Sequence, residues 1–115
     1  MRLDELREFA GSALTVEASK EQHNMRIAAK RLRYVLELFA PCLGEDAEIA
    51  RQAAKRLQSV LGDLHDCDLM LGKVEGVGSV EAALRERRQR LFREFVELWQ
   101  AEASRGTWAG LEASL

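Results

Sequence analysis

The chain has 115 residues, of which 47% are hydrophobic and 31% are charged, and its formal net charge is −2. This composition indicates one folded domain with its own core, and it excludes a disordered chain and a protein that is basic throughout. A single proline and few β-branched residues disfavour β-sandwiches and β-barrels. No apolar run reaches the roughly 20 residues of a membrane span. The start of the chain lacks a signal-peptide core, and the two isolated cysteines suit a reducing compartment, so we expect a cytoplasmic protein without a membrane partner.

The hydrophobic pattern predicts four helical segments along the chain. They cover about residues 3–17, 22–40, 45–71 and 79–104, and residues 106–115 show no clear period and are expected to be irregular. A capping-box pattern at residues 19–22 precedes the second segment, and Pro41 and Gly44 are expected to end it. Because the connections are short, neighbouring helices should run antiparallel. The predicted fold class is therefore all-α, an up-and-down four-helix bundle formed by a single domain over residues 1–115.

Positive charge is concentrated in two blocks of this faintly acidic chain. Residues 20–34 carry five basic residues and one acid, and residues 85–93 carry five arginines and one acid. Blocks of this kind indicate a local anion site rather than a uniformly basic surface.

One face of the second predicted helix is almost entirely cationic. On a helical wheel it gathers His23, Arg26, Lys30, Arg33, Tyr34 and Glu37, opposite an apolar face of Met25, Ala28, Ala29, Leu32, Leu36 and Phe39. A solvated basic face is one interpretation. However, Glu37 is the only acid on the row, and like charges three or four residues apart repel one another. The alternative is that a ligand supplies the missing negative charge.

The third predicted helix carries a matching polar row of Arg51, Lys55, Gln58, His65 and Asp66. Gly62 falls within this row and would allow a close approach to the backbone. If the second and third helices pack antiparallel, the two rows can flank one shared groove. On the fourth helix, Arg88 projects from the apolar side; it is either an arginine that extends to solvent or one that reaches the same anion.

Two stretches of the sequence resemble the CHAD family, the conserved-histidine α-helical domain. HNMRIAAKRLRY at residues 23–34, followed by LELFAP at residues 36–41, is similar to that family's signature helix. KRLQ at residues 55–58 and LGDLHD at residues 61–66 resemble its next helix. The likeness is strongest over residues 22–68, and it is weaker over the arginine-rich fourth segment and at both ends.

This resemblance implies an all-helical domain that binds inorganic polyphosphate through basic residues lining a cavity, with no catalytic role and no cofactor. Family members occur alone or beside triphosphate-processing CYTH domains. Carried onto this sequence, the implied anion ligands are His23, Arg26, Lys30, Arg33, Lys55, Arg51 and Arg88. Tyr34 and Glu37 match the family pattern as well and are candidates for a structural role.

Two features depart from the family pattern. Family domains usually hold two four-helix repeats, whereas this chain resembles one repeat, the second more than the first. We therefore expect a homodimer that completes the cavity, with apolar residues near the ends, such as Phe9 and Trp108, covering the exposed edge. A monomer with a shallow basic face is the alternative. In addition, His65 stands where the family commonly has Asn, and it either adds a titratable donor or replaces one polar group with another.

Three other functions compete with anion binding. A metal-dependent phosphohydrolase is suggested by His23 and His65-Asp66, which imitate the H…HD…D order of helical HD hydrolases, but no aspartate follows Asp68, and the basic row disfavours a divalent cation. Nucleic-acid binding shares the electrostatics, yet no reading motif and no row of exposed aromatic residues indicates it. A structural helical interaction module is the third alternative.

Overall fold

A computed structural model describes residues 2–15 and 18–114 of the chain. Within these ranges it contains helices and no strand, which confirms the all-α class. The helices are α1 (Arg2–Ala13), α2 (Ser19–Leu43), α3 (Glu45–Lys73), α4 (Gly78–Arg105) and α5 (Thr107–Ser114). The molecule is elongated, with principal extents of 52 × 25 × 19 Å.

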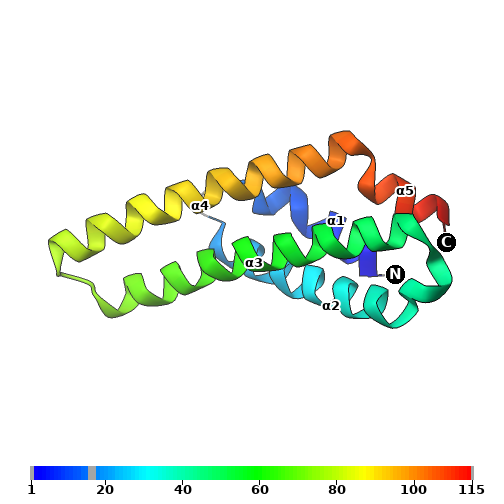
Figure 1. The fold of residues 1–115 in the computed structure, drawn as a ribbon. Coiled ribbons are helices and arrows are strands. Elements are labelled where there is room, and N and C mark those ends of the chain that lie inside the picture. The colour runs from blue at the N-terminus through cyan, green and yellow to red at the C-terminus, as the bar shows by residue number, and fades with distance from the viewer. Residues whose placement is uncertain (1, 16–17, 115) are drawn as a thin grey trace.

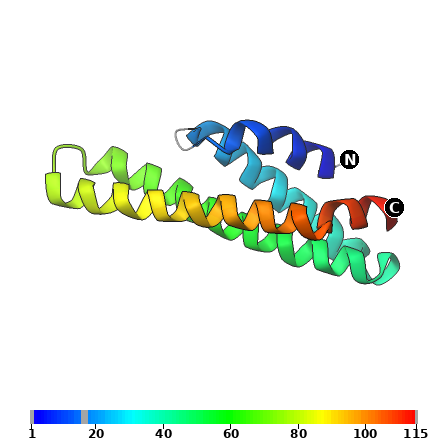
Figure 2. The same ribbon diagram turned by 90° about the horizontal axis from the view of Figure 1, so that it is seen from above.

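The helices pack around α3, which contacts α2, α4 and α5, while α1 contacts α2. α1 begins and α5 ends at the same end of the molecule, and the α3–α4 connection lies at the opposite end (Figures 1 and 2). Ser19, the first residue of α2, accepts a hydrogen bond from Arg88 in α4. The part of the α3–α4 hairpin beyond this point therefore extends past α2, as both views show.

The core lies where α1, α2, α3 and α4 meet. Its largest buried side chains are Leu3, Leu6, Met25, Leu32, Leu57, Leu61, Leu64, Phe95 and Leu111. Four fully buried alanines line the first part of α3, namely Ala47, Ala50, Ala53 and Ala54. Small side chains there let the neighbouring helices approach α3 closely. The polar row of α3, from Arg51 to Asp66, lies on the opposite side of the helix from these alanines.

The prediction that residues 106–115 are irregular was wrong, because residues 107–114 form α5. Gly106 adopts a left-handed conformation with φ +74°, which ends α4 and redirects the chain. Trp108 is 3% exposed and stacks on Trp99 with ring centroids 5.7 Å apart. Eight residues are too few to show a helical period, so tertiary burial rather than pattern fixes this helix. Trp108 is thus buried within its own chain and does not cover an exposed edge, and Phe9 is half-buried.

The junction of α1 and α2 differs from the predicted capping box. Gln22 is 2% exposed, and its amide donates to the carbonyl oxygens of Ala13 and Thr15 at 3.2 and 3.0 Å. No side chain caps the first turn of α2. Gln22 therefore ties the first turn of α2 to the C-terminal end of α1, and its buried amide is used in these hydrogen bonds and not as a cap.

The remaining helix ends differ from the predictions by a few residues. α1 ends at Ala13, and residues 16–17 of the predicted first segment lie outside the described residues. α2 continues through Pro41 to Leu43 and stops at Gly44, whose φ is +82°. No helix in the described part of the chain is long and apolar enough to cross a membrane.

Candidate functional site

The polar rows of α2 and α3 flank one open groove, as the sequence predicted. The groove has a volume of about 320 Å³ and is lined by Arg26, Arg33, Lys55, Gln58, Ser59, Gly62, Asp63 and Asp66. α2 contributes two arginines, and α3 contributes the other six residues. Ser59 and Asp63 were not among the predicted residues, although their places on the α3 wheel put them beside Lys55 and Asp66.

Gly62 allows Arg26 to lie directly over α3. A Cβ atom at Gly62 would be 3.2 Å from Nε of Arg26, which is tighter than ordinary van der Waals contact. That Nε atom is buried and has no hydrogen-bond partner in the structure. The guanidinium is therefore held across the groove by packing, with donors left over for a ligand.

Three cations around the groove lack a protein counter-charge. Among the described residues, Arg26, Lys30 and Lys55 form no ion pair. Arg33 is different, because its Nε lies 3.5 Å from Oε1 of Glu37. Positive charge thus enters the groove from both helices. Among the described residues, Arg26 and Lys55 form no ion pair with Asp63 or Asp66 of the same wall, which leaves both cations available to an external anion.

Arg51 lies at the edge of this site and is largely engaged. Its Nε and Nη2 donate to the carboxylate of Glu48 at 2.9 and 2.7 Å, and its Nη1 lies 3.7 Å from Glu37. The hydrogen bond from Arg51 is the main reason that the pKa of Glu48 falls to about 2. Arg51 does not line the groove and shares its charge between two acids of its own chain.

Tyr34 supports two of the cations from the outer side of α2. Its ring centroid lies 4.7 Å from Cζ of Arg33 and 5.9 Å from Nζ of Lys30. The ring is half-exposed, and its face is occupied by these cations. Tyr34 therefore restrains basic side chains by cation–π contact.

His23 and His65 stack on one another where the two helices meet, one helical turn from Arg26. Their ring centroids lie 4.2 Å apart with an interplanar angle of 21°. Nδ1 of His23 is buried and has no hydrogen-bond partner. Burial lowers the pKa of His23, and the nearby His65 and Arg26 lower it further. The sequence placed both histidines on the polar rows, but their stacking depends on the register of α2 against α3, which the sequence pattern does not specify.

Arg88 lies away from the groove. Its guanidinium pairs with the carboxylate of Asp68 and donates to Oε1 of Gln22 at 2.8 Å and to Oγ of Ser19 at 3.0 Å. It therefore ties α4 to α3 and to the first turn of α2. Of the seven implied ligands, the structure brings Arg26, Arg33 and Lys55 into the groove wall, places Lys30 and His23 along the same row, and separates Arg51 and Arg88.

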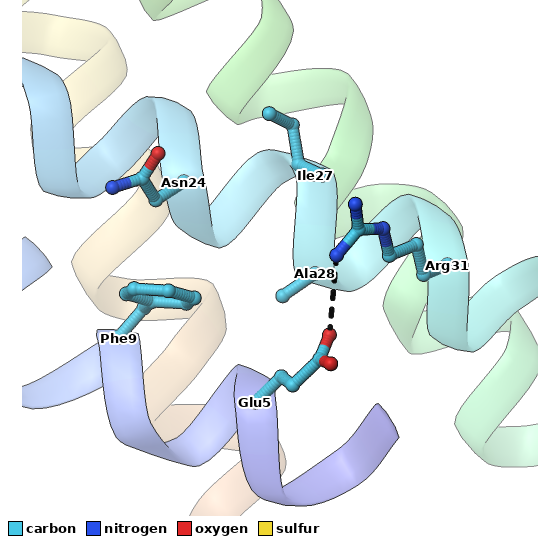
Figure 3. Close-up of a pocket in the computed structure, with 6 residues that line it drawn as sticks. All are labelled: Glu5, Phe9, Asn24, Ile27, Ala28 and Arg31. Atoms are coloured by element: carbon cyan, nitrogen blue, oxygen red, sulfur yellow. Dashed lines mark ion pairs between the residues drawn. The ribbon is translucent and has the colours of Figure 1, made fainter. Parts of the chain in front are cut away.

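A second hollow, of about 160 Å³, lies between α1 and α2 and has a different character. Figure 3 shows Phe9, Ile27 and Ala28 in its wall and an ion pair between Glu5 and Arg31 at its edge, with a separation of 3.7 Å. Because the arginine there already faces a carboxylate, this hollow offers no surplus positive charge. The groove between α2 and α3 is therefore the better anion site.

Within residues 2–15 and 18–114, no group of three or more His, Cys, Asp or Glu side chains is arranged to share a metal ion. His65 and Asp66 stand next to one another in the chain, but adjacent helical residues point in different directions.

Comparison with known proteins gives one match. A family model described as the CHAD domain matches residues 2–75, which include the whole of α1, α2 and α3 and hence both walls of the groove. Comparisons with curated proteins and with solved structures found no match.

Proposed function

The chain belongs to the CHAD family, a family linked to polyphosphate binding, and on that premise we propose that it binds inorganic polyphosphate in the groove between α2 and α3 without catalysing a reaction. The observation that carries this proposal is that Arg26 of α2 and Lys55 of α3 face one groove without an ion-pair partner among the described residues, with Lys30 on the same row of α2.

The shape of the site suits a chain-like anion. The cationic row from His23 to Arg33 extends roughly 15 Å along α2, because each helical residue rises about 1.5 Å. Polyphosphate presents a charged phosphate at every repeat, so several of these side chains can contact one molecule. Arginine forks bind pairs of phosphate oxygens, and lysine adds compact positive charges.

Nucleic acid would satisfy the same cations but finds less support. Tyr34 lies outside the groove wall with Lys30 and Arg33 against its ring, and the residues that line the groove include no aromatic side chain on which a base could stack. A slim polyanion without bases fits this arrangement better.

The test is a binding assay with long-chain polyphosphate, orthophosphate and single-stranded DNA, each at a low and a moderate salt concentration. We expect polyphosphate to bind most tightly and its affinity to fall steeply with salt, because counterions are released on binding. The variant Arg26→Glu/Lys55→Glu should lose this binding and keep its helical circular dichroism. Equal affinity for DNA and polyphosphate would favour the nucleic-acid alternative, and unimpaired binding by the variant would contradict the site.

We also propose that the chain associates as a homodimer. The α3–α4 hairpin exposes four large apolar side chains near its tip, where it extends past α2: Leu69, Met70, Val77 and Val80 are 42–52% exposed. Apolar groups that gather on a projecting pair of helices favour burial against a second surface. Light scattering should give twice the chain mass, and Leu69→Glu/Val80→Glu should give the monomer mass. A monomeric wild type at micromolar concentration would contradict this proposal.

A further inference from the structure

We propose that the stacked pair of His23 and His65 makes anion binding proton-linked, so that a polyphosphate chain bound in the groove is accompanied by uptake of a proton on this pair. This inference rests on the proposed function of the groove and adds a regulatory input to it. The family resemblance does not provide it, because His65 stands where that family commonly has Asn.

The geometry of the pair disfavours two positive charges. The imidazole of His23 comes from α2 and that of His65 from α3, and their centroids are 4.2 Å apart in a nearly parallel stack. Two imidazolium rings at this separation would repel each other with little water between them. Nδ1 of His23 is already buried without a partner, so protonating the ring there would leave a buried donor unsatisfied.

The other charged groups around the pair come from three helices. α2 contributes Arg26, a further positive charge close to His23. α3 contributes Asp66, in the groove wall, and Asp68, whose carboxylate is paired with Arg88 of α4. Among the described residues, neither imidazole forms an ion pair with any of these carboxylates. The counter-charge that would stabilise a protonated pair is therefore absent until an anion arrives.

The consequence for binding follows from linkage. In the free protein the pKa of His23 is lowered by burial, by His65 and by Arg26, so its ring is mainly neutral near pH 7. A polyanion beside the ring favours the charged form and raises its pKa. Because the bound state holds more protons, affinity is highest below the free-state pKa and falls as the pH rises through the bound-state pKa. One proton taken up corresponds to a change of at most about tenfold in affinity per pH unit.

His65 has a defined part in this mechanism. It lowers the pKa of His23 in the free protein. Replacing it with Asn removes this repulsion, so the ring of His23 is protonated more easily. We expect His65→Asn to bind polyphosphate more tightly than wild type near pH 8 and to show a shallower pH dependence. His23→Gln should bind more weakly at pH 6 and change little with pH.

The experiment measures proton uptake by titration calorimetry with long-chain polyphosphate at pH 6, 7 and 8, in two phosphate-free buffers of different ionisation enthalpy. The chain contains only two histidines, so His23→Gln/His65→Asn provides the baseline for protons exchanged by the ligand and by other groups. Wild type should take up a substantial fraction of one proton at pH 7 above this baseline. Imidazole Cε1–H resonances of the free protein and of the complex should show the corresponding rise in the pKa of His23.

The outcomes separate this inference from the proposed function. If wild type binds polyphosphate with the same proton count and pH profile as His23→Gln/His65→Asn, the proton linkage is wrong and the groove assignment stands. If wild type does not bind polyphosphate at pH 6 and low salt, both proposals are wrong. Circular dichroism of each variant verifies that the helices remain folded.

Discussion

The two arginine-rich regions of this chain look alike in sequence and differ in what their charges contact. In the block at residues 85–93 of α4, Arg85 and Arg88 pair with Glu81 and Asp68, and the other three arginines are exposed to solvent. In the wall of the groove between α2 and α3, Arg26 and Lys55 form no ion pair within the described residues.

The two regions differ in whether their cations point toward a common space. The remaining arginines of this block, Arg87, Arg90 and Arg93, are exposed around a single helix, so their fields diverge into solvent. Arg26 and Lys55 come from different helices and face a common space. A block of arginines in a sequence therefore does not by itself mark an anion site; opposing cations from two packed helices do.

The strongest test of this comparison replaces two basic residues with glutamate in each region. Lys30→Glu/Arg33→Glu should weaken polyphosphate binding by about 100-fold or more at low salt, because two phosphate contacts become repulsive. Arg87→Glu/Arg90→Glu changes the net charge by the same amount on the exposed side of α4 and should have only a small effect. Fluorescence anisotropy with a labelled polyphosphate chain measures both affinities. Similar losses in the two variants would show that net charge alone controls binding.

A second prediction concerns a structural use of arginine at the end of α4. Glu102 is 1% exposed, and it accepts hydrogen bonds from Arg56 at 3.1 Å, from Arg105 at 2.9 Å and from the hydroxyl of Thr107. Glu102→Ala should lower the free energy of unfolding by about 2–3 kcal/mol, because it leaves buried donors without an acceptor. Urea unfolding measures this loss. Polyphosphate affinity should be unchanged, and a large loss of binding would contradict the separation of the two regions.

The same carboxylate predicts an acid dependence of stability. Burial alone would raise the pKa of Glu102, but the hydrogen bonds from Thr107 and Arg56 and the charges of Arg56 and Arg105 bring it below the ordinary value of 4.5. A lowered folded-state pKa contributes stability above pH 4.5 that is lost as the pH falls through the folded value. The difference in melting temperature between wild type and Glu102→Gln should therefore shrink as the pH falls below 4.5, and a difference that stays constant over the acidic range would exclude this titration.

A smaller effect is expected at Gly62. Gly62→Ala places a methyl group 3.2 Å from the present position of Nε in Arg26, so the guanidinium must move. We expect polyphosphate affinity to fall by about three- to tenfold while the melting temperature stays close to wild type, since alanine favours the helix. Gly72→Ala is the matched control, because a Cβ there meets nothing within 4 Å. An unchanged affinity in Gly62→Ala would show that Arg26 does not need its present position.

Only a small effect on binding is expected at Arg88. Arg88→Gln removes the contacts that join α4 to Asp68 and to the start of α2. The free energy of unfolding, measured with urea, should therefore fall by about 1–2 kcal/mol. At temperatures where the variant is fully folded, its polyphosphate affinity should stay within about twofold of wild type. A loss comparable to that of the Lys30 and Arg33 variant would restore Arg88 to the ligand set implied by the family resemblance.

These results show which parts of the structure the sequence pattern predicts. The all-α class and the positions of α2, α3 and α4 followed from long apolar rows at helical spacing. The groove followed from the two polar rows, because antiparallel helices bring such rows together. α5 could not be predicted, since its eight residues are held by Trp108, Leu111 and the buried Glu102 rather than by a periodic pattern.

At the site, the sequence predicted residue types better than their contacts. Arg88 was placed correctly on the inner side of α4, but its partner Asp68 lies 20 residues away in the chain and could not be recognised from spacing. The stacking of His23 on His65 likewise depends on a register that only tertiary packing defines. Gly62 was the informative exception: its place within a polar row indicated a close approach, and Arg26 is the side chain that approaches.

The stack of Trp99 on Trp108 provides an optical signal at the end of the molecule away from the α3–α4 connection. These are the only two tryptophans of the chain, and their rings lie 5.7 Å apart with an interplanar angle of 25°. Indoles this close couple their electronic transitions, so the near-ultraviolet circular dichroism and the emission should change when α5 leaves α4. The folded state of α5 can therefore be followed without a label, independently of whatever occupies the groove.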